Sequence, residues 1–204
     1  WILAALTITV GNFSALMQSH VKRMLAFSSV SHAGYLVLGV LVLNSVGLSA
    51  VLFYLVVYSV MNLGAFGIIL LLEKDDKGLV FEDYRGFSSQ HPWMAGAMAL
   101  FMISLAGFPP TGGFVAKYGL LSSAVSEGYI WLVIIAVLNT LVSAYYYLRL
   151  IVNMYMQEEK ESPHPVSGVL VLGLIGLLAV IVLTLGITPE ILLKITAEAA
   201  TTVF

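Results

Sequence analysis

The sequence predicts an all-α membrane protein, a bundle of about six transmembrane helices of which one is discontinuous. Three observations predict this class. Of the 204 residues, 60% are hydrophobic and only 10% are charged, and the mean hydropathy is +0.99. Several uncharged stretches are long enough to cross roughly 30 Å of hydrocarbon. A segment rich in proline and glycine, residues 107–113, interrupts one of these stretches and predicts a break in that helix.

Six uncharged runs predict the membrane spans, and we treat residues 1–204 as a single transmembrane domain. The approximate bounds of these runs are 1–19, 28–43, 48–72, 93–106 with 113–126, 129–148 and 165–187. The fourth run contains the break. As one straight helix it would be roughly 50 Å long at about 1.5 Å per residue, far more than a bilayer requires.

The break itself follows from backbone chemistry. Pro109 and Pro110 lack amide donors and clash with the preceding turn, so they end a helix. Gly107, Gly112 and Gly113 lower the cost of unwinding around them. Unwound backbone at membrane depth must be satisfied by protein or water, which predicts a packed and hydrated interior at this point.

The basic residues indicate which end of the bundle faces the cytoplasm. Seven of the nine Lys and Arg lie in alternate connections, which meet at one end of an up-and-down bundle: Lys22, Arg23, Lys74, Lys77, Arg85, Arg149 and Lys160. The positive-inside rule makes this end cytoplasmic, so that both chain ends face outward. Trp1 lies inside an apolar run, without a preceding Met or basic segment, and we expect the natural chain to begin upstream of it.

Lys117 is the first candidate for function, because it is the one formally charged side chain within a predicted span. Charged residues at membrane depth are costly and mark ion paths. The C-terminal carbonyl groups of the first half-helix favour a cation there, whereas desolvation disfavours one. Such a lysine can take up and release a proton, whereas an arginine would stay charged. The alternative is a structural scaffold without a titrating site, in which Lys117 snorkels or forms a fixed ion pair.

His32 is the second candidate for proton transfer, because an imidazole titrates close to physiological pH. The alternative is a neutral histidine that is hydrogen-bonded to a helix carbonyl, to Ser28 or to Ser31. Hydroxyl and amide groups in the spans could hold relay waters, although they also join membrane helices. These supporting residues are Tyr58, Asn62, Thr111, Tyr118 and Ser122.

Other features have structural interpretations. Three consecutive tyrosines, residues 145–147, predict an interfacial aromatic belt beside Arg149. Gly64 and Gly67 indicate close helix packing. Near the C-terminus, Thr188 is predicted to be an N-cap that opens a short amphipathic helix on the outer membrane surface. Its predicted apolar side consists of Ile191, Leu192 and Ile195.

The remaining properties exclude several classes of site. A formal net charge of −2 gives no reason to expect nucleic acid as a partner. The absence of cysteine excludes disulfides and cysteine-ligated metals. The histidines are scattered singly and no glycine-rich phosphate loop follows a strand, so we expect no cofactor or metal in this chain.

Two segments of the chain carry a family resemblance. Residues 11–18 read GNFSALMQ and residues 21–35 read VKRMLAFSSVSHAGY; residues 106–117 read AGFPPTGGFVAK. Together they resemble the antiporter-like membrane subunits of respiratory complex I. The span with Tyr54, Tyr58 and NLGAF at 62–66 looks more like subunit N than subunits L and M, which typically have a histidine in that span.

The resemblance covers essentially the whole chain, but only the C-terminal part of a family member, which has about fourteen spans in two inverted repeats. It implies that Lys117 matches the protonatable lysine of the family's second broken helix. The implied function is proton translocation within NADH:quinone oxidoreductase, coupled to quinone reduction elsewhere in the complex. A multisubunit cation/proton antiporter or a membrane-bound hydrogenase is the related alternative.

The resemblance also implies partners and a location. NADH, flavin, iron-sulfur clusters and quinone would be bound by other subunits, with none in this chain. The partners would be other membrane subunits of complex I, including antiporter-like neighbours, together with the lipid bilayer. The expected location is the bacterial inner (plasma) membrane, as a multi-pass protein with its C-terminus outward.

Overall fold

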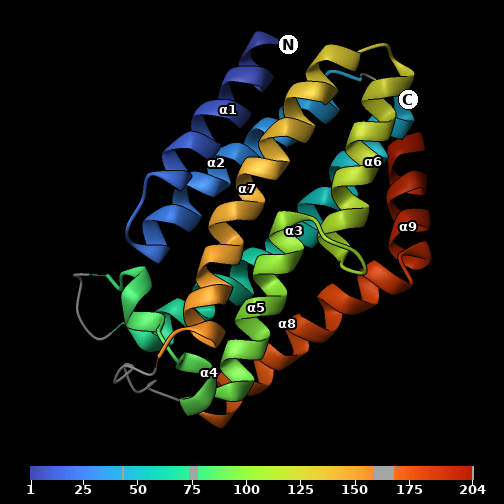
Figure 1. The fold of residues 1–204 in the computed structure, drawn as a ribbon. Coiled ribbons are helices and arrows are strands. Elements are labelled where there is room, and N and C mark those ends of the chain that lie inside the picture. The colour runs from blue at the N-terminus through green and yellow to red at the C-terminus, as the bar shows by residue number, and fades with distance from the viewer. Residues whose placement is uncertain (43, 74–77, 159–167, 204) are drawn as a thin grey trace.

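The structure is a computed structural model that describes residues 1–42, 44–73, 78–158 and 168–203. Within these ranges the chain is helical, as the sequence predicts, and Figure 1 shows the helices packed as one bundle. The elements are α1 (Ile2–Leu16), α2 (Val21–Val40), α3 (Ser45–Leu72), the short 3-10 helix η1 (Phe81–Tyr84), α4 (Phe87–Gln90), α5 (Pro92–Ala106), α6 (Gly112–Ser126), α7 (Ile130–Met156), α8 (Val169–Ile187) and α9 (Glu190–Thr201).

Among the described residues, three helices are long and apolar enough to cross a membrane unaided. These are α3, α7 and α8, the last over Leu170–Ile187. The helices α1 and α5 are apolar but shorter. The discontinuous helix is confirmed, because α5 ends at Ala106 and α6 begins at Gly112.

Several basic residues lie on helices rather than in connections. Helix α2 begins at Val21 rather than near residue 28, and α7 continues to Met156 rather than ending near residue 148. Lys22 and Arg149 are therefore helical, because these helices continue beyond their apolar stretches. Arg23 is also in the first turn of α2. Three other basic residues, Lys74, Lys77 and Lys160, lie outside the described residues.

The helix ends and connections that carry the basic residues meet at one end of the bundle. The Val21 amide donates to the Leu79 carbonyl over 3.1 Å, and the Phe81 amide donates to the Ser19 carbonyl over 3.2 Å. The Gly86 amide donates to the carbonyl of Asn153 near the end of α7, over 3.2 Å. Figure 1 shows both chain ends at the opposite end of the bundle.

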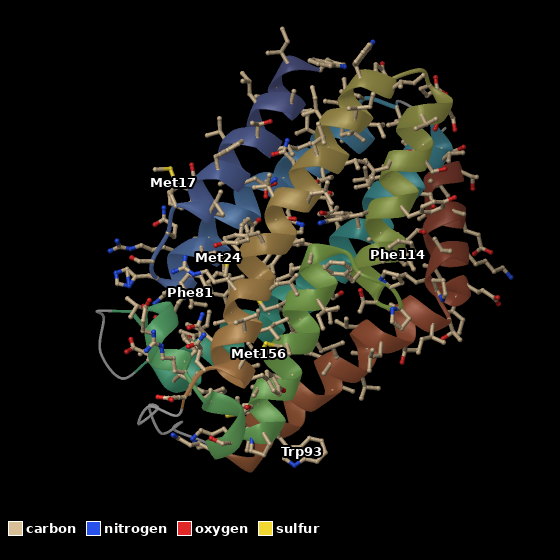
Figure 2. The ribbon with its side chains drawn as sticks, viewed as in Figure 1. Met17, Met24, Phe81, Trp93, Phe114 and Met156 are labelled. Carbon is tan, nitrogen blue, oxygen red and sulfur yellow. The ribbon has the colours of Figure 1, made fainter. Side chains whose placement is uncertain are left out.

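Side chains reinforce this end. The Lys22 ammonium lies 2.6 Å from a carboxylate oxygen of Glu73, the residue that follows α3. The Arg149 guanidinium lies 4.2 Å from the centre of the Phe81 ring. Trp93, at the start of α5, is 90% exposed and projects away from the bundle (Figure 2). An exposed indole at the end of an apolar helix is typical of a membrane interface.

Glycines permit the closest helix contacts in the bundle. A Cβ atom on Gly11 of α1 would lie 2.5 Å from the Ser31 amide nitrogen of α2, so α1 and α2 could not pack as they do with a larger residue there. The prediction for Gly64 is confirmed, because the Phe101 ring of α5 lies directly against it. The prediction for Gly67 is wrong: a Cβ there would come no nearer than 4.0 Å to Ile175, an ordinary contact.

Helix α8 ends against the break between α5 and α6. A Cβ on Gly186 would overlap the Pro110 carbonyl oxygen and main-chain atoms of Thr111. The predicted cap at this point is wrong by one residue: Thr188 terminates α8, and Pro189 is the N-cap of α9. The two prolines of the break are thus covered on one side by the end of a neighbouring helix.

Helix α9 packs along α3, and its predicted apolar side is not the buried side. Ile191 and Ile195 are 76% and 56% exposed, whereas Thr196 and Ala200 are buried. The Thr196 hydroxyl lies 3.1 Å from that of Ser49 on α3. The predicted short helix is therefore present, but of its predicted apolar side only Leu192 packs against the core, and the small residues Thr196 and Ala200 allow α9 to approach α3 closely.

Candidate functional site

The break gives the end of α5 a defined geometry. Gly107 caps the helix with φ of 89°, a left-handed conformation that glycine adopts without a Cβ penalty. The Phe108 amide donates back to the Ile103 carbonyl over 3.1 Å. The carbonyl groups of Leu105 and Ala106 belong to the last turn, where no further helix amide can reach them.

The start of α6 is held against α5 by one serine. The Ser104 hydroxyl accepts a hydrogen bond from the Gly113 amide over 3.1 Å and lies 2.8 Å from the sulfur of Met61 on α3. A Cβ on Gly113 would overlap the Ser104 carbonyl. Thr111 is buried, and its hydroxyl donates to the Phe108 carbonyl over 2.7 Å inside the break. Several polar groups of the broken backbone are thus satisfied within the protein.

Lys117 reaches from α6 to the free carbonyl end of α5. Its Nζ donates to the Leu105 and Ala106 carbonyl oxygens over 2.9 and 3.1 Å. Lys117 is only 5% exposed. The carbonyl end of a helix carries a partial negative charge, which stabilises a cation. The partners of the ammonium on α5 are main-chain carbonyls, so α5 balances its charge with peptide dipoles. Helix α5 contains no carboxylate.

A tyrosine ring and a cavity complete the surroundings of Lys117. The Nζ lies 5.2 Å from the centre of the Tyr35 ring of α2, within the range of a cation–π contact. A cavity of about 150 Å³ adjoins the lysine. A water molecule occupies about 30 Å³ of liquid, so the space is large enough for water, and Lys117 and Thr140 are polar groups in its mainly apolar lining. The cavity is lined by Gly107, Phe114, Lys117, Tyr118, Leu121, Val137 and Thr140.

His32 lies between two tyrosine hydroxyls. Its Nδ1 is 2.5 Å from the Tyr54 hydroxyl of α3, and its Nε2 is 3.2 Å from the Tyr147 hydroxyl of α7. The imidazole is buried and also stacks on Tyr58, with ring centres 4.7 Å apart. Because both ring nitrogens have a hydroxyl partner, a proton added at one can be balanced by loss at the other. The partners expected for a neutral histidine, Ser28 and Ser31, bond elsewhere.

The polar contacts continue from His32 toward α1. The rings of Tyr147 and Tyr146 have centres 4.6 Å apart. The Tyr146 hydroxyl donates to the Asn12 side-chain oxygen over 2.8 Å. The Asn12 amide in turn donates to the Ser31 hydroxyl over 2.8 Å and to the Asn139 side-chain oxygen over 3.3 Å. Residues of α1, α2, α3 and α7 thereby form one buried polar row.

The structure brings some predicted supporting residues to the site and leaves others apart. Tyr58 contacts His32, and Thr111 is part of the break. Asn62 is half-buried on α3, one turn beyond Tyr58. Tyr118 is 65% exposed, although it lines the cavity beside Lys117. Ser122 is exposed and lines a different cavity, between α3, α6 and α9.

The prediction of a tyrosine belt at residues 145–147 is wrong for two of the three. Tyr145 is exposed, but Tyr146 and Tyr147 are buried in the polar row. Successive residues on a helix point about 100° apart, so three adjacent tyrosines cannot share one lipid-facing side. That spacing is a signal that at least one of the three faces the protein, although it does not say which one. Lone amides in apolar spans, Asn12 and Asn139, are a second such signal.

Within the part of the chain that the structure describes, no group of three or more His, Asp or Glu side chains is placed to hold a metal ion. The chemistry available in this region is hydrogen bonding and proton exchange by an amine, an imidazole and several phenols.

Comparisons with known proteins agree on one family. A family model described as NADH:quinone oxidoreductase/Mrp antiporter, transmembrane, matches residues 1–143. NADH-quinone oxidoreductase subunit N of Trichlorobacter lovleyi is 47% identical over 98% of this chain and 41% of its own length. Subunit N 1 of Chloroherpeton thalassium is 42% identical over 97% of this chain and 42% of its own length. The chain thus spans about two fifths of the length of these relatives.

Solved structures have the same fold. A chain of respiratory complex I from Thermus thermophilus with bound aureothin superposes with a TM-score of 0.85 at 32% identity, over 95% of this chain and 44% of that one. A chain of the Mrp complex from a Dietzia species superposes with a TM-score of 0.87 at 23% identity, over 98% and 46%. At that lower identity, the second likeness concerns the fold alone.

Proposed function

Because this chain belongs to the NADH:quinone oxidoreductase/Mrp antiporter transmembrane family, we propose that it forms part of a proton-translocating subunit of NADH:quinone oxidoreductase. Lys117 is the group that carries the proton. Quinone reduction in other subunits drives its changes of protonation. The subunit is a component of the enzyme, whereas NADH, flavin, iron-sulfur clusters and quinone are bound by its partners.

One observation supports this role most directly: the Lys117 ammonium lies buried on two carbonyl oxygens at a broken helix. These dipoles stabilise the charged amine, and within the described residues no carboxylate holds it permanently as an ion pair. The neutral amine keeps two N–H groups, which can still donate to the same two carbonyl oxygens. Both protonation states are therefore accessible to Lys117, which a proton carrier requires.

The surroundings supply routes to and from the amine. The cavity of about 150 Å³ beside Lys117 has room for waters that could exchange protons with it. His32, bracketed by the hydroxyls of Tyr54 and Tyr147, is the second proton-transfer group. Phenol and imidazole groups in contact can pass a proton by exchanging donor and acceptor roles. Tyr58 and Thr111 support this region by stacking on His32 and by ordering the break.

The subunit is proposed to act in a bacterial inner membrane, beside other membrane subunits of the complex. The end of the bundle that carries Lys22, Arg85 and Arg149 faces the cytoplasm, because basic residues accumulate on that side. The chain ends, which lie at the other end of the bundle, face outward.

Two alternatives differ in what Lys117 would do. In a cation/proton antiporter or membrane-bound hydrogenase the same lysine would exchange protons, but without coupling to quinone. Identity of 47% to a subunit N over 98% of this chain favours the quinone-linked enzyme. In a structural scaffold Lys117 would be a fixed hydrogen-bond donor to α5.

The test is Lys117→Ala and Lys117→Glu in the full-length subunit, assembled in its complex. Proton pumping and quinone reduction are measured together in membrane vesicles. We expect both variants to assemble and to lose most of the protons pumped per quinone reduced, because neither retains an amine on the Leu105 and Ala106 carbonyls. Lys194→Ala, which removes an exposed lysine of α9, is the matched control. Normal pumping by an assembled Lys117→Ala variant would refute the proposal.

A further inference from the structure

Tyr35 contacts Lys117 in a way that depends on charge. Its ring face lies 5.2 Å from the Nζ of Lys117. The face of an aromatic ring is negative because of its quadrupole, so it attracts an ammonium but offers little to a neutral amine. The contact is therefore stronger in one protonation state of Lys117 than in the other.

The position of this ring is fixed from α7. The Tyr35 hydroxyl donates to the Ala136 carbonyl over 2.8 Å and lies 2.7 Å from the Thr140 hydroxyl. Tyr35 is buried. Thr140 also lines the cavity beside Lys117, so one residue of α7 both holds the tyrosine and faces the space next to the amine.

The same ring faces the histidine end of the site. The Tyr35 and Tyr54 rings are stacked with centres 6.4 Å apart, and Tyr54 bonds to His32. Tyr35 and His32 themselves have ring centres 6.3 Å apart. Tyr35 thus lies between the two groups to which proton transfer is assigned above.

We propose that Tyr35 is a positioning residue that holds the charged form of Lys117 over its ring and so sets the pH at which this lysine releases its proton. The inference rests on the proposed function of Lys117. The hydroxyl of Tyr35 keeps the ring in place through α7, and the ring face acts on the ammonium. With a ring of the same shape but less negative charge on its face, Lys117 would release its proton at lower pH.

Few other groups around Lys117 titrate. On α2 these are Tyr35 and His32, and on α3 they are Tyr54 and Tyr58. On α7, Tyr147 faces the histidine. Helices α5 and α8 have no titratable residue, and α6 adds Tyr118. His32 interacts with the charge of Lys117. The cation–π contact of the Tyr35 ring face is with Lys117, so a response graded by the charge of that face reports on the lysine.

The test replaces Tyr35 in the full-length subunit, within the assembled complex, and follows protons pumped per quinone reduced as a function of pH. Tyr35→Phe keeps the ring and removes the hydroxyl. Phenylalanine with one, two or three ring fluorines keeps the shape but progressively weakens the negative face. Tyr35→Leu removes the ring.

The expected result is a graded shift of the alkaline side of the pH profile. Tyr35→Phe loses the hydroxyl contacts to α7 but keeps a ring, so it moves the profile slightly to lower pH. Each fluorine moves the profile further in the same direction, and Tyr35→Leu moves it by roughly half a unit to one and a half units. The fluorinated series is close to isosteric, so it carries the test if Tyr35→Leu does not assemble.

Two results have distinct meanings. If the fluorinated variants all pump like Tyr35→Phe at every pH, the ring face has no influence on Lys117 and the inference is wrong. Pumping that falls equally in Tyr35→Phe and Tyr35→Leu, without a shift in pH, would mean that Tyr35 only joins α2 to α7. Either result leaves the proposed function standing if Lys117→Ala still abolishes pumping. Normal pumping in Lys117→Ala would overturn both proposals.

Discussion

At the scale of single residues, Gly107 controls how closely Lys117 approaches the end of α5. Its φ is 89°, and a Cβ there would lie 2.9 Å from Lys117 Cδ. We expect Gly107→Ala to lower the free energy of unfolding by about 1–2 kcal/mol, because an L-residue is strained in this conformation. We also expect fewer protons pumped per quinone reduced, because the added methyl group pushes the lysine away from its carbonyl partners. Thermal unfolding of the purified complex and vesicle pumping assays measure the two effects.

Gly128 offers a matched control for this substitution. Its φ is 81°, and no atom lies within 4 Å of a Cβ built there. Gly128→Ala therefore imposes a similar backbone cost without touching Lys117. If the two variants are destabilised alike and also pump alike, the contact between Gly107 and Lys117 has no functional importance.

A functional residue whose type is unusual for its segment can be predicted from sequence. A functional residue that is marked only by the side of the helix on which it lies cannot. Lys117 was identified because a charge in an apolar span needs a local explanation, and the carbonyl partners at the break follow from the same argument. The sequence pattern places Tyr146 and Tyr147 at the membrane interface, but the structure buries them. The side that a helix buries depends on its neighbouring helices, which a local pattern does not show. Apolar residues surround these helices on nearly all sides, so hydrophobic periodicity does not reveal that side.

At the scale of helices, the end of α8 covers the break and should be sensitive to added volume. A Cβ on Gly186 would overlap the Pro110 carbonyl and Thr111. We expect Gly186→Ala to force α8 away from the break at a cost of roughly 1–3 kcal/mol, as overpacking of a close contact does. The measurement is the midpoint of thermal unfolding of the purified full-length subunit in detergent.

The control for this prediction lies on the same helix. Gly173 has no atom within 4 Å of a built Cβ, so Gly173→Ala adds volume to open space. Alanine is also the better helix former by about 1 kcal/mol. The midpoint of Gly173→Ala should therefore be unchanged or higher. A Gly186→Ala variant as stable as Gly173→Ala would show that α8 does not need its present approach to the break.

The elements differ in how well the sequence predicts them. The break was expected between residues 106 and 113, and α5 and α6 flank residues 107–111, because proline and glycine act on the backbone locally. The ends of α2 and α7 were misjudged, because charged residues were assumed to lie outside helices. The position of α9 along α3 depends on contacts of Thr196 and Ala200 with residues far apart in sequence, and no local signal reports them.

At the scale of the whole molecule, the grouping of the basic connections could be anticipated from sequence, and the contacts that join them could not. Alternate connections of an up-and-down bundle must meet at one end, whatever their detailed path. The main-chain contacts of Val21 with Leu79 and of Gly86 with Asn153 join these connections directly. The basic end is therefore held together by main-chain contacts, and the side of the membrane on which it lies would set the direction of the proposed proton path through Lys117.

That direction can be measured, because residues 1–204 contain no cysteine and single cysteines introduced here report on one place each. Glu82→Cys and Gln157→Cys lie at the basic end, and Ser126→Cys and Thr202→Cys lie at the other; all four positions are exposed. We expect a membrane-impermeant maleimide to label Ser126→Cys and Thr202→Cys in intact cells, because the positive-inside rule orients the basic end to the cytoplasm. Glu82→Cys and Gln157→Cys should react only after permeabilisation, which also verifies that they are reactive. Labelling in the reverse pattern would mean that the bundle has the opposite orientation in the membrane. The proposed cytoplasmic side of the path through Lys117 would then be wrong.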